Sequence, residues 1–155
     1  MRNRGTIIGL VIMGICGIAA VSATAHEHNV PPGPILERHE LMEGIGKNAK
    51  VIGDAMKSGN FAAVGGAAEK IQAAAAKIPG LFPQGSTHAN SRAKAEIWTE
   101  WPKFETESKH LEETAGALAV AAKSAGDIPA AAQAMFNSCK SCHDSFRVPE
   151  KKKKG

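Results

Sequence analysis

The stretch IPAAAQAMFNSCKSCHDSF, residues 128–146, decides the fold of this chain. Its inward-facing candidates recur every three or four residues, at Ile128, Ala132, Met135, Cys139, Cys142 and Phe146. That spacing places them along one face of an α-helix. Asp127, directly before the stretch, can accept a hydrogen bond from the first turn as an N-cap. The stretch therefore predicts a C-terminal amphipathic helix whose inward face carries both cysteines.

Within this stretch, residues 139–143 (C-K-S-C-H) have the C-x-x-C-H spacing at which c-type haem is attached covalently. Two thiols three residues apart share one helix face, so each can add to one vinyl group of the porphyrin. His143 then supplies the proximal iron ligand. The alternatives are a redox dithiol, which normally opens a helix after a strand, and a zinc site, which needs a second ligand pair. No strand pattern precedes Cys139, and the one other cysteine is Cys16, so we predict one haem c.

Two more amphipathic helices are predicted upstream. The first begins at Pro34 and ends at Gly59-Asn60, with one apolar row at seven-residue spacing: Ile35, Met42, Ala49 and Met56. A second row interleaves with it: Arg38, Ile45 and Ile52. The next helix, over 61–78, stops before Pro79-Gly80. The three-four alternation of both helices indicates that they pack against other helices.

One more helix, which precedes the C-terminal one, is predicted to begin near Pro102, because proline suits a first turn. A loop over about 81–88 and a short helical piece over 89–98 lead into it. Its outer face carries charged residues, which predict a solvated surface: Lys103, Glu105, Glu107, Lys109, Glu112 and Glu113. Since no alternating strand pattern occurs, the fold class is all-α. We expect an antiparallel, up-down four-helix bundle with the haem near its C-terminal helix.

The first 25 residues have the anatomy of a secretory signal peptide. Arg2 and Arg4 give a basic start, residues 7–21 form an apolar run, and residues 23–25 (A-T-A) are an A-x-A cleavage site. An uncleaved membrane anchor is the alternative, because the apolar run is close to spanning length. The glycines and the small residues at the end of the run favour cleavage. We therefore expect the protein in the periplasm.

Removal of residues 1–25 leaves 130 residues, which is one domain's worth of chain. The basic residues fall from 19 to 17 against 15 acidic ones, a net charge of +2. Two haem propionates would bring that charge near zero, so we expect no nucleic-acid partner. No membrane association is expected after cleavage. The mature chain divides into a lead-in over 26–33, the bundle over 34–148 and a basic tail over 149–155.

Three side chains have more than one interpretation from their positions. Arg38 occupies a core-facing position, where its charge needs either a partner such as a haem propionate or a path to solvent. Met42 is either an ordinary core residue or an iron ligand. Arg147 follows His143 by four residues, so it either lies beside the proximal imidazole or complements the negative end of the helix.

These motifs resemble the class II c-type cytochromes, the cytochrome c′ family, over nearly all of residues 34–147. The resemblance rests on four segments, which are RHELM at 38–42, LFP at 81–83 with Gly85-Ser86, AKAEIW at 93–98 and CHDSFR at 142–147. It implies that residue 42 faces the open side of the haem, and it favours the low-spin branch of the family, in which Met42 is the distal iron ligand. It also implies haem-edge contacts for Arg38, His39, Ser91 and Arg92. Two departures are Trp101 before Pro102, and His39 where glutamine is common.

The resemblance predicts an electron-transfer cytochrome with His143 and Met42 as axial ligands, not an enzyme. The alternative is a five-coordinate cytochrome c′ that binds or sequesters NO or CO. For this chain we expect redox proteins of unknown identity as partners. A homodimer is a further expectation. The basic tail at 151–154 is a flexible end or a docking segment for an acidic partner.

A separate expectation concerns the new N-terminus. If cleavage falls after Ala25, the mature chain begins His26-Glu27-His28. Its α-amine, two amide nitrogens and the His28 imidazole can surround Cu(II) or Ni(II) in one plane. The alternative is a frayed terminus without a ligand.

Overall fold

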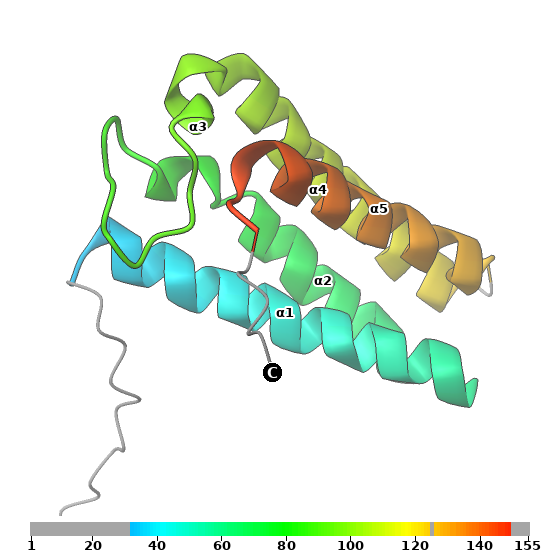
Figure 1. Ribbon diagram of the computed structural model, residues 1–155. Helices are drawn as coiled ribbons and strands as arrows, with labels where there is room; N and C mark the ends of the chain where they lie inside the picture. The colour runs from blue at the N-terminus through cyan, green and yellow to red at the C-terminus, as the bar shows by residue number, and fades with distance from the viewer. Residues whose placement is uncertain (1–31, 125, 150–155) are drawn as a thin grey trace, which may run out of the picture.

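The computed structural model of the chain describes residues 32–124 and 126–149, and four long helices account for most of them (Figure 1). These are α1 (Pro34–Ser58), α2 (Val64–Ala75), α4 (Trp101–Lys123) and α5 (Ile128–Phe146). The 3-10 turn η1 (Pro79–Leu81) and the short helix α3 (Glu96–Thr99) lie in the connection between α2 and α4. The signal peptide, the His26-Glu27-His28 terminus and the lysine tail lie outside the described residues.

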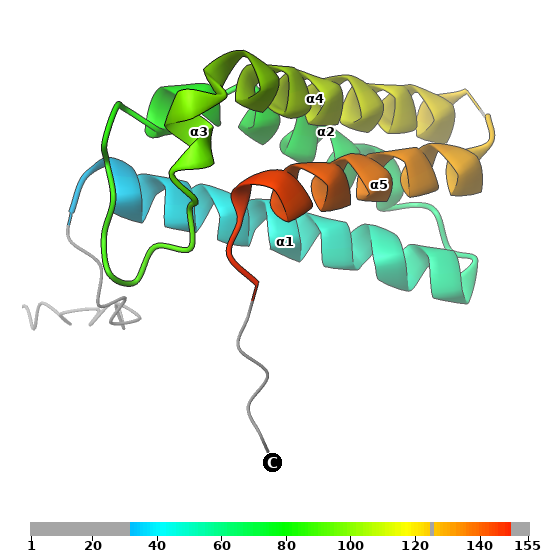
Figure 2. The same ribbon diagram turned by 45° about the horizontal axis from the view of Figure 1, so that its top comes forward.

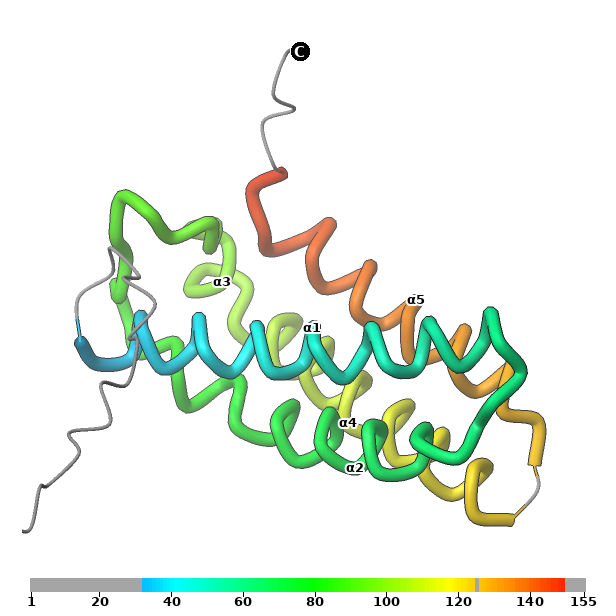
Figure 3. The backbone as a smooth tube through the Cα atoms, turned by 90° about the horizontal axis from the view of Figure 1, so that it is seen from below, coloured from blue at the N-terminus to red at the C-terminus, as the bar shows by residue number. Residues whose placement is uncertain are grey.

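Successive long helices run in opposite directions, so the predicted antiparallel four-helix bundle is confirmed (Figures 1 and 2). α2 packs against both α1 and α4, whereas α5 packs chiefly against α4 and makes little direct contact with α1. Figure 3 shows α2 following α1 along its length and α5 crossing α1 obliquely. Among the four long helices, α1 and α5, which carry the predicted iron ligands, are therefore the neighbours with the weakest mutual packing.

The α1 helix begins and ends where its sequence predicts. Pro34 occupies the first turn, and Gly59 ends the helix with φ of 73°, a left-handed conformation that glycine adopts without a steric penalty. The row made of Arg38, Ile45 and Ile52 is buried. The row made of Ile35, Met42, Ala49 and Met56 is half-buried. One face of α1 is thus fully covered by the bundle, and the adjoining face is only partly covered.

The α2 helix is shorter than predicted, because turns replace helix at both ends. At the start, the Ala62 amide donates to the Asn60 side-chain oxygen over 3.2 Å, which holds the chain in a turn. At the end, the Ile78 amide bonds the Ala75 carbonyl over 3.0 Å, a tighter three-residue closure. The predicted span of 61–78 is therefore wrong at both boundaries, although the helix itself is confirmed.

The core of the bundle combines small residues between α2 and α4 with an aromatic cluster at one end. A Cβ added to Gly116 on α4 would come within 2.6 Å of the Gln72 amide nitrogen on α2. Phe104 stacks edge-on against both Phe82 and Phe146, with ring centroids 4.9 and 5.3 Å apart. This cluster joins the connection, α4 and the end of α5 in one apolar contact.

Residues 89–95, predicted as part of a short helix, are not helical, because their main chain pairs with the residues that follow α5. Ala93 and Arg147 form an antiparallel bridge, and the Val148 amide donates to the Arg92 carbonyl over 2.8 Å. This tertiary pairing holds residues 92–94 extended, and the helix starts only at Glu96. The connection is therefore attached to the end of the helix that carries the C-x-x-C-H motif.

Among residues 32–124 and 126–149, none of the helices has the length and apolar character that a bilayer crossing requires.

α5 begins as the sequence predicts. The Asp127 carboxylate accepts a hydrogen bond from the Ala130 amide over 3.0 Å, which confirms the N-cap.

Candidate functional site

Cys139 and Cys142 are half-buried free thiols of α5, in contact with the hydrophobic core. Burial raises the pKa of Cys139. Burial is also the main cause that raises the pKa of Cys142 to about 12, and the Glu107 carboxylate adds to the effect, as does Cys139 when it is ionised. Both groups are therefore neutral thiols near neutral pH. Two such thiols on one inward helix face fit the formation of two thioether bonds to a porphyrin.

In the described part of the chain, His, Cys, Asp and Glu side chains form no group of three or more that could hold a metal ion. A structural zinc ion needs four such ligands. A porphyrin iron needs only one ligand from this motif, since the ring supplies four nitrogens. The residues present therefore fit haem c better than a zinc ion.

His143 lies in the last turn of α5 and is exposed at a pocket of about 420 Å³. Arg92 and Arg147 line the same pocket. The protein around His143 partly desolvates its ring and so lowers its pKa, and the charges of Arg147 and Arg92 lower it further, although Asp144 opposes them. The neutral imidazole is the form that binds a metal. Arg147 therefore lies at the same pocket as His143 and helps to lower its pKa, and its role toward an iron stays a prediction.

Arg38 is only 5% exposed, so the alternative in which its side chain reaches solvent is wrong. Its guanidinium donates to the Ser86 carbonyl over 2.5 Å and to the Ser86 hydroxyl over 3.3 Å. It also stacks over the Phe82 ring, 4.7 Å from the centroid. Burial lowers the pKa of Arg38 from its usual value. Arg38 therefore attaches the connection between α2 and α4 to the first half of α1.

Replacing Arg38 with methionine should lower the free energy of unfolding by about 1–3 kcal/mol, because the Ser86 carbonyl loses a charged donor in a partly buried site. Denaturant unfolding of the haem-loaded protein, followed by circular dichroism, measures the change. Lys47→Met is the control, since Lys47 is an exposed residue of α1 that pairs with Glu43 on the surface, and it should change stability by less than about 0.5 kcal/mol. An equal effect of the two variants would contradict this account of Arg38.

Met42 lies on the half-buried row of α1 and contacts the hydrophobic core. It belongs to the helix that makes little contact with α5, the helix of the cysteines. The thioether is therefore partly accessible instead of sealed in the core. This position is compatible with a distal ligand, and the assignment stays a prediction.

The remaining residues predicted to contact the haem edge differ in their surroundings. His39 is exposed on α1. The Ser91 hydroxyl accepts a hydrogen bond from the Ala93 amide over 3.3 Å. Arg92 lines the pocket together with His143. The fold thus brings Arg92 beside the predicted ligand His143, and the haem contacts of all three residues stay predictions.

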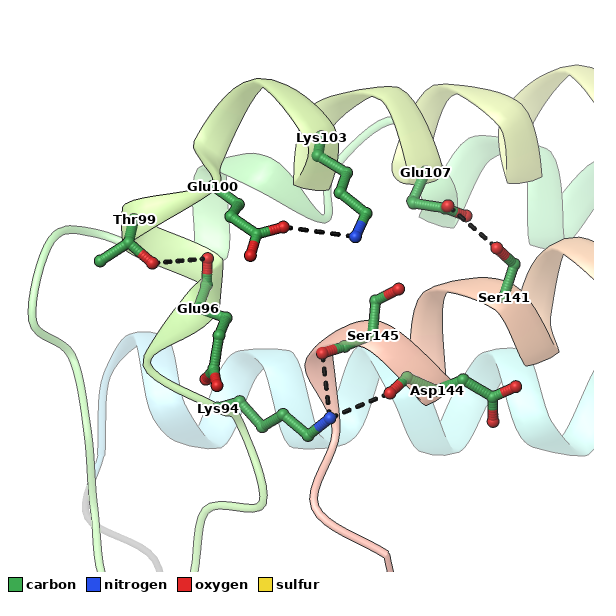
Figure 4. A network of polar contacts seen from close by, with 9 residues as sticks. All are labelled: Lys94, Glu96, Thr99, Glu100, Lys103, Glu107, Ser141, Asp144 and Ser145. Carbon is green, nitrogen blue, oxygen red and sulfur yellow. Dashed lines mark hydrogen bonds and ion pairs between the residues drawn. The ribbon is translucent and has the colours of Figure 1, made fainter.

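Glu107 corrects the expectation of a uniformly solvated face on α4. Its side chain is half-buried, with one carboxylate oxygen accepting a hydrogen bond from the Ser141 hydroxyl over 2.9 Å (Figure 4). The other oxygen is buried and has no hydrogen-bond partner among residues 32–124 and 126–149. The helical spacing could have predicted this burial of Glu107. This residue follows Phe104 by three residues and precedes Leu111 by four, and both of those residues are buried.

The fold and the C-x-x-C-H helix together define the class of protein as a c-type cytochrome built on a four-helix bundle. A family model described as Cytochrome C' matches residues 33–147. The chain is 31% identical to the cytochrome c′ of Rhodospirillum rubrum over 88% of its own length and 97% of that protein. It therefore belongs to the cytochrome c′ family. Proteins of this family carry one covalent haem c, and that is the cofactor of this chain.

Two more similarities bear on the kind of cytochrome. The chain is 29% identical to a cytochrome c-556 of Rhodopseudomonas palustris over 72% of its length and 80% of that protein. Among solved structures it is similar to the cytochrome c prime of Shewanella frigidimarina, with a TM-score of 0.70 and 28% identity. That similarity covers 75% of this chain and 94% of the other. The comparisons thus support the cytochrome c′ family as a whole and do not indicate its low-spin branch.

Proposed function

We propose that this chain transfers electrons through its haem c, with His143 as the proximal iron ligand and Met42 as the distal one. When bound, haem c supplies an iron that takes up and gives back one electron. The observation that carries the proposal is Met42, a half-buried thioether in contact with the core, four residues after Arg38 on the same helix. Paired histidine and methionine ligands are the means by which cytochromes c raise the reduction potential.

The roles of the other residues follow from their chemistry. Cys139 and Cys142 would hold the porphyrin by thioether bonds, so that the cofactor cannot dissociate. The neutral imidazole of His143 would bind the iron. Arg38 is our candidate partner for a propionate, because its buried guanidinium can form charge-assisted hydrogen bonds with a carboxylate.

The second candidate is a five-coordinate cytochrome c′ that binds or sequesters NO or CO, with Met42 standing away from the iron. The comparisons favour this candidate over the electron carrier, because the matching family, the R. rubrum relative and the S. frigidimarina structure are all cytochromes c′. Neither candidate is an enzyme in the usual sense.

The absorption and electron paramagnetic resonance spectra of the purified haem-loaded protein separate the two candidates. A bound Met42 should give a low-spin ferric haem with the far-red charge-transfer band of a thioether ligand. A high-spin ferric haem, together with a ferrous form that binds CO without delay, would establish the second candidate and exclude the first.

We propose a periplasmic location on the basis of residues 1–25, and redox proteins as partners. One solved structure of this fold, at 24% identity and a TM-score of 0.69, is titled a cytochrome c′ with ligand-controlled dimer dissociation. A homodimer of this chain is accordingly a proposal. Light scattering of the mature protein coupled to gel filtration tests it.

A further inference from the structure

The helix that carries His143 ends without the usual terminating residue. α5 stops at Phe146, and Arg147 follows in an extended conformation, with φ of −121° and ψ of 130°. No glycine in the left-handed conformation closes the helix. The last four carbonyls of any helix lack partners inside the helix, so the carbonyls of residues 143–146 need partners from elsewhere. The Arg147 amide supplies the first, by donating to the His143 carbonyl over 3.0 Å.

Lys94 supplies partners to the other three. Its ammonium donates to the carbonyls of Asp144 and Ser145, over 2.9 and 3.0 Å (Figure 4). Its own backbone amide donates to the Phe146 carbonyl over 3.0 Å. One residue, 50 positions away from Asp144, thus completes the end of the helix. A cation at this end also complements the negative pole of the helix dipole.

The main chain that precedes Lys94 is fixed against the residues that follow α5. Ala93 forms the antiparallel bridge with Arg147, and the Arg92 carbonyl accepts from the Val148 amide. Lys94 is itself half-buried. Its ammonium therefore approaches the helix end from a backbone that is already held in place, which lowers the entropy cost of ordering the long side chain.

We propose that Lys94 is a positioning residue for His143: it closes the last turn of α5 from outside the helix and thereby fixes the direction of the imidazole. Without the ammonium, the carbonyls of Asp144 and Ser145 lose their protein donors, and the last turn can open while Cys139 and Cys142 stay attached one turn earlier. His143 would then have more than one orientation toward its ligand site. This role of Lys94 rests on the proposed function in one respect, which is that His143 is the iron ligand.

The test compares three variants of the full haem-loaded chain. Lys94→Met keeps the apolar stem and the backbone amide but removes the ammonium. Lys94→Arg restores a donor that can reach two carbonyls. Lys140→Met is the matched control, because Lys140 is on α5 and pairs with the Asp144 carboxylate instead of a carbonyl. All three are compared with the unaltered protein by hydrogen exchange of the amides in residues 143–148, and by electron paramagnetic resonance of the ferric haem.

We expect exchange in residues 143–148 to accelerate by about tenfold or more in Lys94→Met, since hydrogen bonds to a charged donor contribute at least that factor. Lys94→Arg should stay near the rate of the unaltered protein, and Lys140→Met should not change it. The ferric spectrum of Lys94→Met should also broaden or split, because the imidazole orientation is no longer unique.

Unchanged exchange in Lys94→Met, or an equal acceleration in Lys140→Met, would show that Lys94 does not close the helix. Faster exchange with an unaltered haem spectrum would limit Lys94 to a structural role and overturn its role as a positioning residue. A haem spectrum unchanged by His143→Ala would instead overturn the proposed ligand, which is a separate failure.

Discussion

The double variant Cys139→Ala, Cys142→Ala is expected to carry no covalent haem. Both thiols are half-buried on the inward face of α5, and Cys16 lies within the predicted signal peptide. The mature variant would therefore have no sulfur with which to form a thioether bond. Mass spectrometry of protein produced in cells with working cytochrome maturation should show the bare polypeptide beginning at His26, whereas the unaltered protein should show that mass plus one haem.

Ser141→Ala is the control for this experiment, because Ser141 is an exposed residue between the two cysteines, and its hydroxyl donates a hydrogen bond to the Glu107 carboxylate. It should retain the full haem content. Haem that resists denaturation in the double variant would mean that attachment uses another group, and a bare mass for the unaltered protein would overturn the attachment itself.

Loss of the haem should also weaken the bundle. α1 and α5 make little direct contact, so a prosthetic group that touches both would contribute much of the packing between them. We expect the double variant to keep helical circular dichroism but to unfold at a lower denaturant concentration than the haem-loaded protein. An unchanged midpoint would contradict a structural contribution of the haem.

The long helices could be predicted from the sequence because each is specified by local signals. Pro34 and Gly59 mark the ends of α1, Asp127 marks the start of α5, and apolar residues at three- and four-residue spacing mark the buried faces. These signals act within one or two turns. The same holds for the candidate site on α5, since the spacing of Cys139, Cys142 and His143 along one helix places two thiols and an imidazole together.

Apart from the ends of α2, which local turns decide, the errors occurred where contacts distant in sequence decide the conformation. Residues 92–94 pair with the end of α5 and the residues after it, about 50 positions away, and this pairing keeps residues 89–95 out of a helix. No sequence pattern within residues 89–95 indicates that pairing partner. The burial of Arg38 could be anticipated, but its partner Ser86, 48 positions away, could not. The role of Lys94 was missed for the same reason, because closing a helix from another segment leaves no local pattern.

Met42→Ala is expected to convert the haem from low-spin to high-spin and to open the iron to CO. In the proposed state the thioether occupies the sixth position, so CO binds only to the small fraction of molecules in which Met42 has dissociated. The apparent affinity is reduced by that fraction. If it is about 1%, removing the thioether should raise the apparent CO affinity by on the order of 100-fold. The absorption spectrum reports the spin state, and titration of the ferrous protein with CO reports the affinity.

Met56→Ala is the matched control for Met42→Ala. Met56 lies fourteen residues further along the same row of α1, is likewise half-buried and likewise contacts the core. It should lose a comparable amount of packing, on the order of 2 kcal/mol or more of stability, while its haem stays low-spin. If both variants become high-spin, loosened packing of α1 is the cause instead of a lost ligand. If the unaltered protein is already high-spin and Met42→Ala leaves its CO affinity unchanged, Met42 is a core residue and the chain is a five-coordinate cytochrome c′.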